Sequence, residues 1–183
     1  MKEIFAECLP YDKDLKGRMG GNIPKLIEND LPDGYGFYAT LVHPEKENTM
    51  LSICIDRDFE RLLANDIYPN INIKVIEHEY SYMSDVDSSS LKDFGLCSIS
   101  SYTDHITNKN EFLFIRVYGE PRMIQPKSRY YEQLEKDNYS FFLMIDEEGY
   151  DTDLIDTIFM YGALYLYKHN VTGEVIAGYW QCS

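Results

Sequence analysis

The stretch YGFYATLV, residues 35–42, and the stretch SFFLMI, residues 140–145, decide how this chain folds. Both are rich in aromatic, β-branched and long aliphatic residues, which are the types that pack well in β-strands. Neither alternates cleanly between apolar and polar residues, as a strand with one wetted face does. We therefore expect two strands that are covered on both faces.

Five further segments predict strands. Residues 71–78, INIKVIEH, alternate between apolar and polar side chains at their start, which is the period of a strand with one buried face. The remaining four predicted strands are 50–55, 112–118, 163–168 and 175–181. With 14% aromatic residues and few helical patterns, the chain is expected to be dominated by sheet.

Two segments predict short helices, residues 56–66 and residues 128–136. Asp56 or Asp58 can cap the first helix and Ser128 the second, because a side-chain oxygen there can accept from a free backbone N–H. The expected apolar faces are Phe59, Leu62 and Leu63 in the first helix, and Tyr130, Tyr131 and Leu134 in the second.

A pattern of glycine–proline break, aromatic strand, charged turn and second strand occurs twice, after GGNIP at 20–24 and after YGEP at 118–121. It predicts two degenerate pseudo-repeat halves, 19–82 and 111–183. Residues 83–110 are rich in Ser, Asp and Asn and are expected to connect the halves with little more than one turn of structure. The expected fold is a strand-rich α+β unit, one domain over residues 1–183.

Several of these residues also form a family pattern. The chain resembles the YwqG-like family, uncharacterised bacterial proteins that share domain of unknown function 1963. The second half carries Gly119, Pro121, Gln125, Gly162, Trp180, Gln181 and Cys182 at the matching places, and the first half carries Gly20, Gly21 and Pro24. The resemblance implies a compact, strand-rich α+β fold with structural roles for these motif residues. It implies no activity.

The charge limits the partners that the chain is expected to bind. Its 31 acidic and 17 basic residues give a net charge of −14, which repels phosphate backbones and disfavours ordinary nucleic-acid binding, so we expect no nucleic-acid partner. The same field favours a basic protein partner or simply maintains solubility. No apolar run is long enough for a signal peptide or a membrane helix, so we expect a cytoplasmic protein without a membrane partner.

The four cysteines are scattered through the chain without metal-binding spacing. Cys8, Cys54, Cys97 and Cys182 form no CxxC pair, and in a cytoplasmic protein we expect reduced thiols rather than disulfides or a zinc site. No phosphate-binding loop or nucleophile elbow is present either. We therefore expect no cofactor.

The densest cluster of acidic residues is DEEGYDTDLID, residues 146–156. Oxygen ligands at this density suit calcium or magnesium, but the spacing does not fit an EF-hand loop. Our interpretation is a solvated acidic turn between two strands. The alternative is a weak cation site, and its candidate ligands are Asp146, Glu148, Asp151, Asp153 and His78.

Two histidines follow predicted strands and supply an enzymatic alternative. If the strand ends that carry His43 and His78 meet, the imidazoles could act with Glu77 or Glu79 as a metal site or a general base. The alternative function is therefore a metal-dependent or hydrolytic enzyme that uses both histidines and the carboxylates of 146–156. Structural histidines are the competing interpretation.

Tyrosines in polar surroundings provide the binding hypothesis. Tyr80, Tyr82, Tyr130 and Tyr131 are candidates for an exposed aromatic surface, and Gln125 is the side chain of the second turn that could touch a ligand. Tyrosines at the rim of an ordinary core are the other interpretation. With the acidic charge, this surface predicts a non-catalytic protein-interaction module, for example an immunity-type protein that neutralises a basic partner. Binding of a small ligand or sugar in a groove between the halves is a further alternative.

Overall fold

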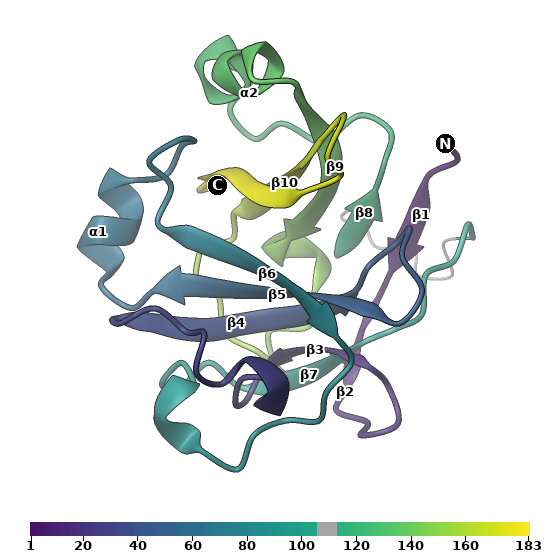
Figure 1. Ribbon diagram of the computed structural model, residues 1–183, viewed down its shortest axis with the longest axis vertical. Helices are drawn as coiled ribbons and strands as arrows, with labels where there is room; N and C mark the ends of the chain where they lie inside the picture. The colour runs from purple at the N-terminus through teal and green to yellow at the C-terminus, as the bar shows by residue number, and fades with distance from the viewer. Residues whose placement is uncertain (106–112) are drawn as a thin grey trace.

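The computed structural model describes residues 1–105 and 113–183. Within these ranges eleven strands form two antiparallel sheets that face each other (Figure 1). The five-stranded sheet has the order β1 (Ile4–Ala6), β8 (Ile115–Val117), β9 (Tyr139–Asp146), β10 (Ala163–His169) and β11 (Val175–Gln181). The six-stranded sheet has the order β2 (Cys8–Pro10), β7 (Leu96–Ile99), β3 (Gly17–Gly20), β4 (Tyr35–Val42), β5 (Thr49–Asp56) and β6 (Ile73–Glu79). The predicted strand-rich α+β fold is confirmed.

All seven predicted strands form, and 35–42 is β4 to the residue. Their ends differ from the prediction by only a few residues, and Phe112, predicted at the start of β8, lies outside the described residues. The unforeseen strands are β1, β2, β3 and β7. Each has three or four residues, too few to show an alternating pattern.

Residues 83–110 were expected to form a connection with little regular structure, but they contain β7. This strand lies inside the six-stranded sheet between β2 and β3. Residues 106–110 of that range fall outside the described residues. A strand with partners on both sides is determined by pairing as much as by its own residues. The composition of this segment, which is rich in Ser and Asp, therefore did not reveal the strand. Whether the two halves arose by duplication stays a prediction.

The helices are short. Helix α1 (Phe59–Ala64) is capped by Asp58, which accepts from the backbone N–H groups of Glu60 and Arg61. Only Leu62 of its predicted apolar face is buried. The second prediction becomes the 3₁₀ turn η3 (Ser128–Tyr130) followed by α2 (Glu132–Lys136), with no side-chain cap. Three more 3₁₀ turns are η1 (Lys25–Ile27), η2 (Asp87–Ser89) and η4 (Glu147–Gly149).

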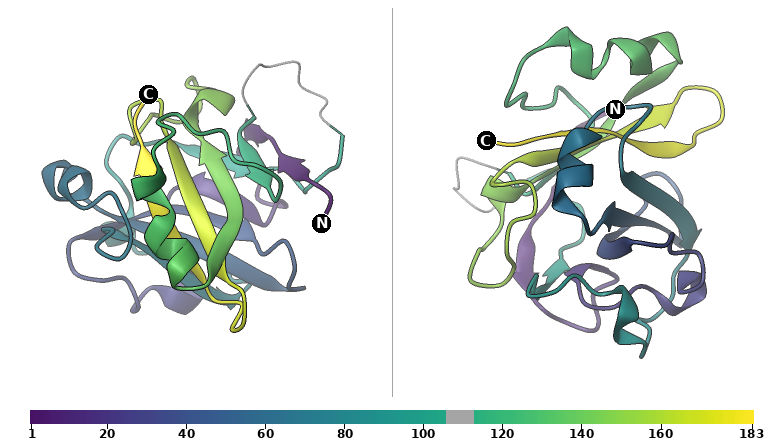
Figure 2. Two further views of the ribbon diagram at one scale, coloured as in Figure 1. Left: turned by 90° about the horizontal axis from the view of Figure 1, so that it is seen from above. Right: turned by 90° about the vertical axis from the view of Figure 1, so that its left-hand side faces the viewer.

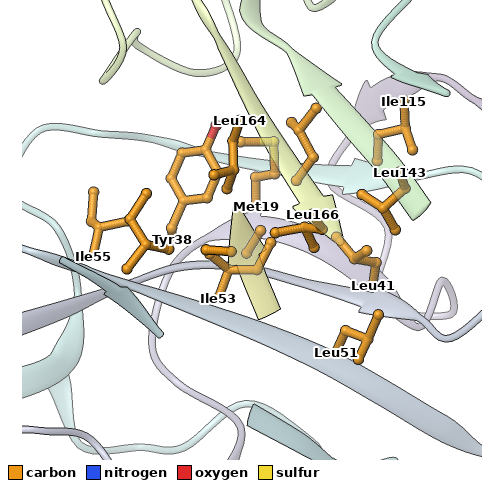
Figure 3. Packing of buried hydrophobic residues seen from close by; sticks show 14 of the residues in the cluster. Met19, Tyr38, Leu41, Leu51, Ile53, Ile55, Ile115, Leu143, Leu164 and Leu166 are labelled. Carbon is orange, nitrogen blue, oxygen red and sulfur yellow. The ribbon is translucent and has the colours of Figure 1, made fainter. Parts of the chain in front are cut away.

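The main hydrophobic core lies between the two sheets (Figure 3). The six-stranded sheet contributes Tyr38, Leu41, Leu51 and Ile53, and the five-stranded sheet contributes Ile115, Leu143, Leu164 and Leu166. All eight are essentially inaccessible to solvent. Each buried aliphatic side chain of this size contributes about 1.5–3 kcal/mol, so this layer is the chief source of stability.

Both sheets are also covered on their outer faces. Tyr165 and Tyr167 of β10 pack under Leu134 of α2, which lies on the side of the five-stranded sheet away from the six-stranded sheet (Figure 2). On the other sheet, Phe37 and Cys54 are covered by the segment around η1. The prediction that strands 35–42 and 140–145 are buried on both faces is confirmed for residues 36–41 and 142–145, whereas Ser140 is exposed and Phe141 is half-buried.

The chain crosses between the sheets and joins them into one unit. Strand β1 belongs to the five-stranded sheet, whereas β2, which begins after Glu7, belongs to the six-stranded sheet. Residues 66–68 run along the edge strand β11: Trp180 N donates to Asp66 O at 3.0 Å, and Tyr68 N donates to Gly178 O at 2.7 Å. The β1–β2 crossing and the hydrogen bonds to β11 thus connect the two sheets at two separate places.

The core between the sheets gives a direct stability prediction. Leu166→Ala should lower the free energy of unfolding by about 2–5 kcal/mol, because it removes a fully buried side chain and leaves a cavity. Val171→Ala, in the turn that follows β10, should change it by less than about 0.5 kcal/mol, since Val171 is 80% exposed. Urea denaturation measures both. Equal losses would contradict the position of the core.

Candidate functional site

Gln125, Gly162, Gln181 and Cys182, four residues of the predicted family pattern, meet at the end of β11. Gln181 Oε1 accepts hydrogen bonds from the backbone N–H groups of Ile124 and Gln125, each at 3.1 Å, and from the hydroxyl of Tyr165 at 3.2 Å. Gln181 Nε2 donates to the carbonyl of Gln125 at 2.9 Å. One buried amide therefore holds the turn that carries Pro121 and Gln125 against the five-stranded sheet.

Gln125 itself is occupied by these contacts. Its Oε1 accepts from the hydroxyl of Tyr130 at 2.9 Å, and its Nε2 faces the carbonyl of Cys182 at 3.5 Å. Gly162 packs so closely on β11 that a Cβ there would lie 1.8 Å from the carbonyl oxygen of Gln181. The geometry gives this group of residues a structural role, and it leaves the side chain of Gln125 little capacity to bind a ligand.

The glycine and proline residues of the first-half motif also make structural contacts. Gly20 adopts a left-handed conformation with φ of +72°, and a Cβ there would lie 2.0 Å from the carbonyl oxygen of Gly95. Pro24 bridges to Met83 in an antiparallel contact. Trp180 Nε1 donates to the carbonyl of Leu62 at 3.2 Å and so connects β11 to α1. These contacts are again structural.

The acidic segment 146–156 divides into buried and exposed parts, which corrects the interpretation of a wholly solvated turn. Asp146 is buried and receives both Nε and Nη2 of Arg122, at 2.8 and 2.9 Å, while Glu148 accepts from the same guanidinium at 2.7 Å. Asp151 and Asp153 are exposed. Within residues 1–105 and 113–183, no group of three His, Cys, Asp or Glu side chains is placed to hold a metal ion.

Glu147 is fully buried and was not singled out by the sequence. Its carboxylate accepts from the backbone N–H groups of Ile158 and Phe159 at 2.7–2.9 Å, so it fastens the loop after η4. Burial raises the pKa of Glu147 to about 7, against the opposing effect of the two N–H donors. This carboxyl is therefore a buried proton-binding group with a structural position.

The two histidines lie on opposite faces of the six-stranded sheet and do not form the expected pair. His43 contacts Phe142 in the core, with ring centroids 5.5 Å apart. Its Nδ1 accepts from the backbone N–H groups of Glu45 and Lys46. Burial lowers the pKa of His43. The imidazole is thus a neutral structural group near pH 7.

His78 instead forms a pair that the sequence did not indicate. Its Nε2 lies 2.7 Å from Ser52 Oγ, and its Nδ1 lies 2.6 Å from the carbonyl oxygen of Glu79. A serine, an imidazole and an orienting acceptor are the parts of a nucleophile–base pair. Ser52 is fully buried, however, and lines none of the cavities described below. No substrate can reach it in this conformation.

A cavity of about 560 Å³ lies on the outer face of the five-stranded sheet beside α2. We call it the aromatic–acidic cavity. Its aromatic lining is Tyr131, Tyr139, Phe141 and Tyr167, and its acidic residues are Glu120 and Glu135. No basic side chain is among its lining residues. Its chemistry suits a cationic group with an aliphatic stem.

A second cavity, of about 420 Å³, lies on the outer face of the six-stranded sheet. We call it the cationic cavity. Its lining includes Lys13, Lys16, Arg18, Tyr11, Tyr80 and Tyr82. Its one carboxylate is Asp14. This concentration of basic groups is unexpected in a chain with a net charge of −14.

The four candidate tyrosines are therefore divided between the two sheets. Tyr131 lines the aromatic–acidic cavity, whereas Tyr80 and Tyr82 line the cationic cavity. Tyr130 is only 3% exposed and packs against Tyr179 with ring centroids 5.1 Å apart, so its assignment to a binding surface is corrected. The lysines of the second cavity went unnoticed because they follow no motif in the sequence.

No family model, curated protein or solved structure matches this chain. The resemblance to the YwqG-like family therefore stays a prediction.

All four cysteines are free. In the described part of the chain, every helix is too short or too polar to cross a membrane.

Glu147 predicts a pH-dependent contribution to stability. The folded protein keeps this proton up to about pH 7, and the unfolded chain releases it near 4.5, so the contribution is full below about pH 4.5 and is lost as pH rises through 7. Glu147→Gln removes this titration. Relative to the unmodified protein, the variant should gain up to about 3 kcal/mol of unfolding free energy between about pH 4.5 and pH 8.

Denaturation with urea across this pH range measures the difference, and Glu60→Gln serves as the control because Glu60 is exposed. A difference between Glu147→Gln and the unmodified protein that does not change with pH would contradict the buried, protonated carboxyl.

The Ser52–His78 pair predicts a structural effect without reactivity. Ser52→Ala should lower the free energy of unfolding by about 1 kcal/mol, because it deprives His78 of a buried hydrogen-bond partner. A fluorophosphonate probe should leave Ser52 unlabelled in the folded protein. Stoichiometric labelling at Ser52, located by peptide mass spectrometry, would favour the hydrolytic alternative instead.

Proposed function

We propose that this chain is a non-catalytic, cytoplasmic interaction module that binds a basic protein through the aromatic–acidic cavity. The observation that carries the proposal is the lining of that cavity: four aromatic rings and two carboxylates with no basic residue. An immunity-type protein that neutralises a basic partner is the concrete form of this function. The YwqG-like resemblance is compatible with it and adds no activity.

The aromatic rings supply the contact area. Tyr131, Tyr139 and Phe141 are partly exposed, so a ligand can reach their surfaces, and Tyr167 lies buried beneath them. A lysine or arginine over such a ring gains about 0.5–2 kcal/mol from the cation–π attraction, more as water is excluded. Tyrosine also loses little side-chain entropy when it is covered by a partner.

The carboxylates supply the selectivity for charge. Glu120 and Glu135 make no ion pair with any residue in the described ranges, so both are free to meet a cation. Arg116 lies nearby, but its guanidinium donates to the main-chain carbonyl of Glu120 and approaches Glu3. The net charge of −14 adds long-range attraction that accelerates encounter with a basic protein.

The enzymatic alternative has weaker support. His43 and His78 lie on opposite sheet faces, and Asp146 is neutralised by Arg122. The two cavities described above also lie on outer faces of the sheets, and the space between the sheets is filled with apolar side chains. A ligand groove between the halves is therefore not the function that we propose.

A fluorescein-labelled oligolysine peptide tests the proposal directly. Anisotropy titrations should show saturable binding that weakens between about 50 and 300 mM salt. Tyr131→Ala should weaken binding about tenfold, because it removes an aromatic wall of the cavity. Oligoglutamate should not bind.

The matched comparison uses two double variants that remove the same charge. Glu120→Gln/Glu135→Gln changes the cavity, whereas Glu47→Gln/Glu60→Gln changes exposed acids elsewhere. Only the first pair should weaken binding by more than about fivefold at low salt. Equal weakening in both pairs would show attraction to the overall charge alone and would overturn the assignment of the site.

A further inference from the structure

The cationic cavity has a buried arginine at its base. Arg18 lies on β3 and is only 6% exposed, yet it is among the residues that line the cavity. Its guanidinium stacks over the ring of Phe37 at 4.6 Å, and Nη1 and Nη2 donate to the main-chain carbonyls of Gly20 and Asn22. These contacts hold the group in a fixed orientation.

Arg18 has no carboxylate partner among the described residues. Asp14 lines the same cavity but makes no ion pair with Arg18. Two backbone carbonyls use two of the five N–H donors of the guanidinium, and three remain. A buried cation without an opposite charge is costly, because desolvation is not offset by Coulomb attraction. The lowering of the pKa of Arg18 to about 10 by burial reflects the same imbalance.

Two lysines add to the positive charge. Lys13 and Lys16 are exposed and line the cavity with Arg18, so that three cations and one carboxylate leave a net formal charge of +2. None of the three cations makes an ion pair within the described residues. This local sign is opposite to that of the whole chain. The cavity is therefore arranged to attract an anion.

Aromatic rings line the rest of the cavity. Tyr80 and Tyr82 meet edge to face with centroids 5.5 Å apart, and Lys16 lies 5.4 Å above the ring of Tyr80. Tyr82 is 76% exposed, so its ring is accessible from solvent. Tyrosine faces of this kind accept a planar ring by stacking. At about 420 Å³, the cavity has room for an anionic group with one ring attached.

We propose that the cationic cavity binds a small aromatic phosphate, with the phosphate on Arg18, Lys13 and Lys16 and the ring on Tyr80 and Tyr82. Arginine suits this role because its planar fork matches phosphate oxygens, and lysine contributes point charges. The site is separate from the aromatic–acidic cavity and does not depend on the function proposed above. It gives the chain a second ligand of opposite charge.

Phenyl phosphate is the probe. Isothermal titration calorimetry should show one saturable site for phenyl phosphate, weaker binding of inorganic phosphate and of benzoate, and no binding of phenol. In ¹⁵N-labelled protein, the amide shifts that move on titration should belong to residues 11–18 and 80–83. Absence of saturable binding, or shifts confined to another region, would overturn the proposal.

Matched lysine variants test the charge without disturbing the core. Lys13→Ala/Lys16→Ala should weaken phenyl phosphate binding about three- to tenfold, while Lys92→Ala/Lys136→Ala removes two exposed lysines elsewhere and should leave it unchanged. Arg18→Lys should abolish most of the binding, because lysine cannot reproduce the planar fork. Its thermal unfolding is compared with that of the unmodified protein, since Arg18 also contacts Phe37.

The lysine variants keep the test decisive if Arg18→Lys fails to fold. Equal affinity in both lysine pairs would show that the ligand does not use this cavity. The comparison with benzoate also distinguishes the two possible anionic groups, phosphate and carboxylate. If benzoate binds as tightly as phenyl phosphate, the site is a carboxylate site and the assignment to phosphate is wrong.

Discussion

Burial of the central strands on both faces is the constraint on which the structure depends. In β10, Leu164 and Leu166 point into the core between the sheets, whereas Tyr165 and Tyr167 point outward. Each sheet can cover only one face of the other, so each outer face needs a cover of its own. The η3–α2 segment provides it on the five-stranded sheet, and the segment around η1 provides part of it on the six-stranded sheet.

Two cavities lie on these outer faces, and their charged residues come from the covers and from neighbouring loops. Beside α2 the cover contributes Glu135, and the turn after β8 contributes Glu120. On the other sheet, the loop before β3 contributes Lys13 and Lys16. A chain with a large excess of acid can thus present sites of both signs, because local loops rather than total charge decide the field in a cavity.

Local patterns predicted the long strands and failed for features that depend on pairing. Residues 35–42 are dense in strand-forming aromatics, so β4 could be located from its own sequence, whereas β7 needs β2 and β3 beside it. Ser52 and His78 meet diagonally across β5 and β6, in a register that no local signal reveals. Tyr130 and Tyr131 are adjacent in sequence, yet one is buried and one lines a cavity, since neighbours on a helical turn face different directions.

Buried charges in the described residues are matched in different ways, and the differences indicate function. Asp56 pairs with Arg61 and Asp146 with Arg122, so each carboxylate meets an opposite charge within the chain. Glu147 is accommodated by backbone N–H donors and by a raised pKa that favours its neutral form. Arg18 has carbonyl acceptors and an aromatic ring but no carboxylate. An arginine cannot readily lose its proton, so the anion that we propose for the cationic cavity would supply the opposite charge that the chain itself does not place beside Arg18.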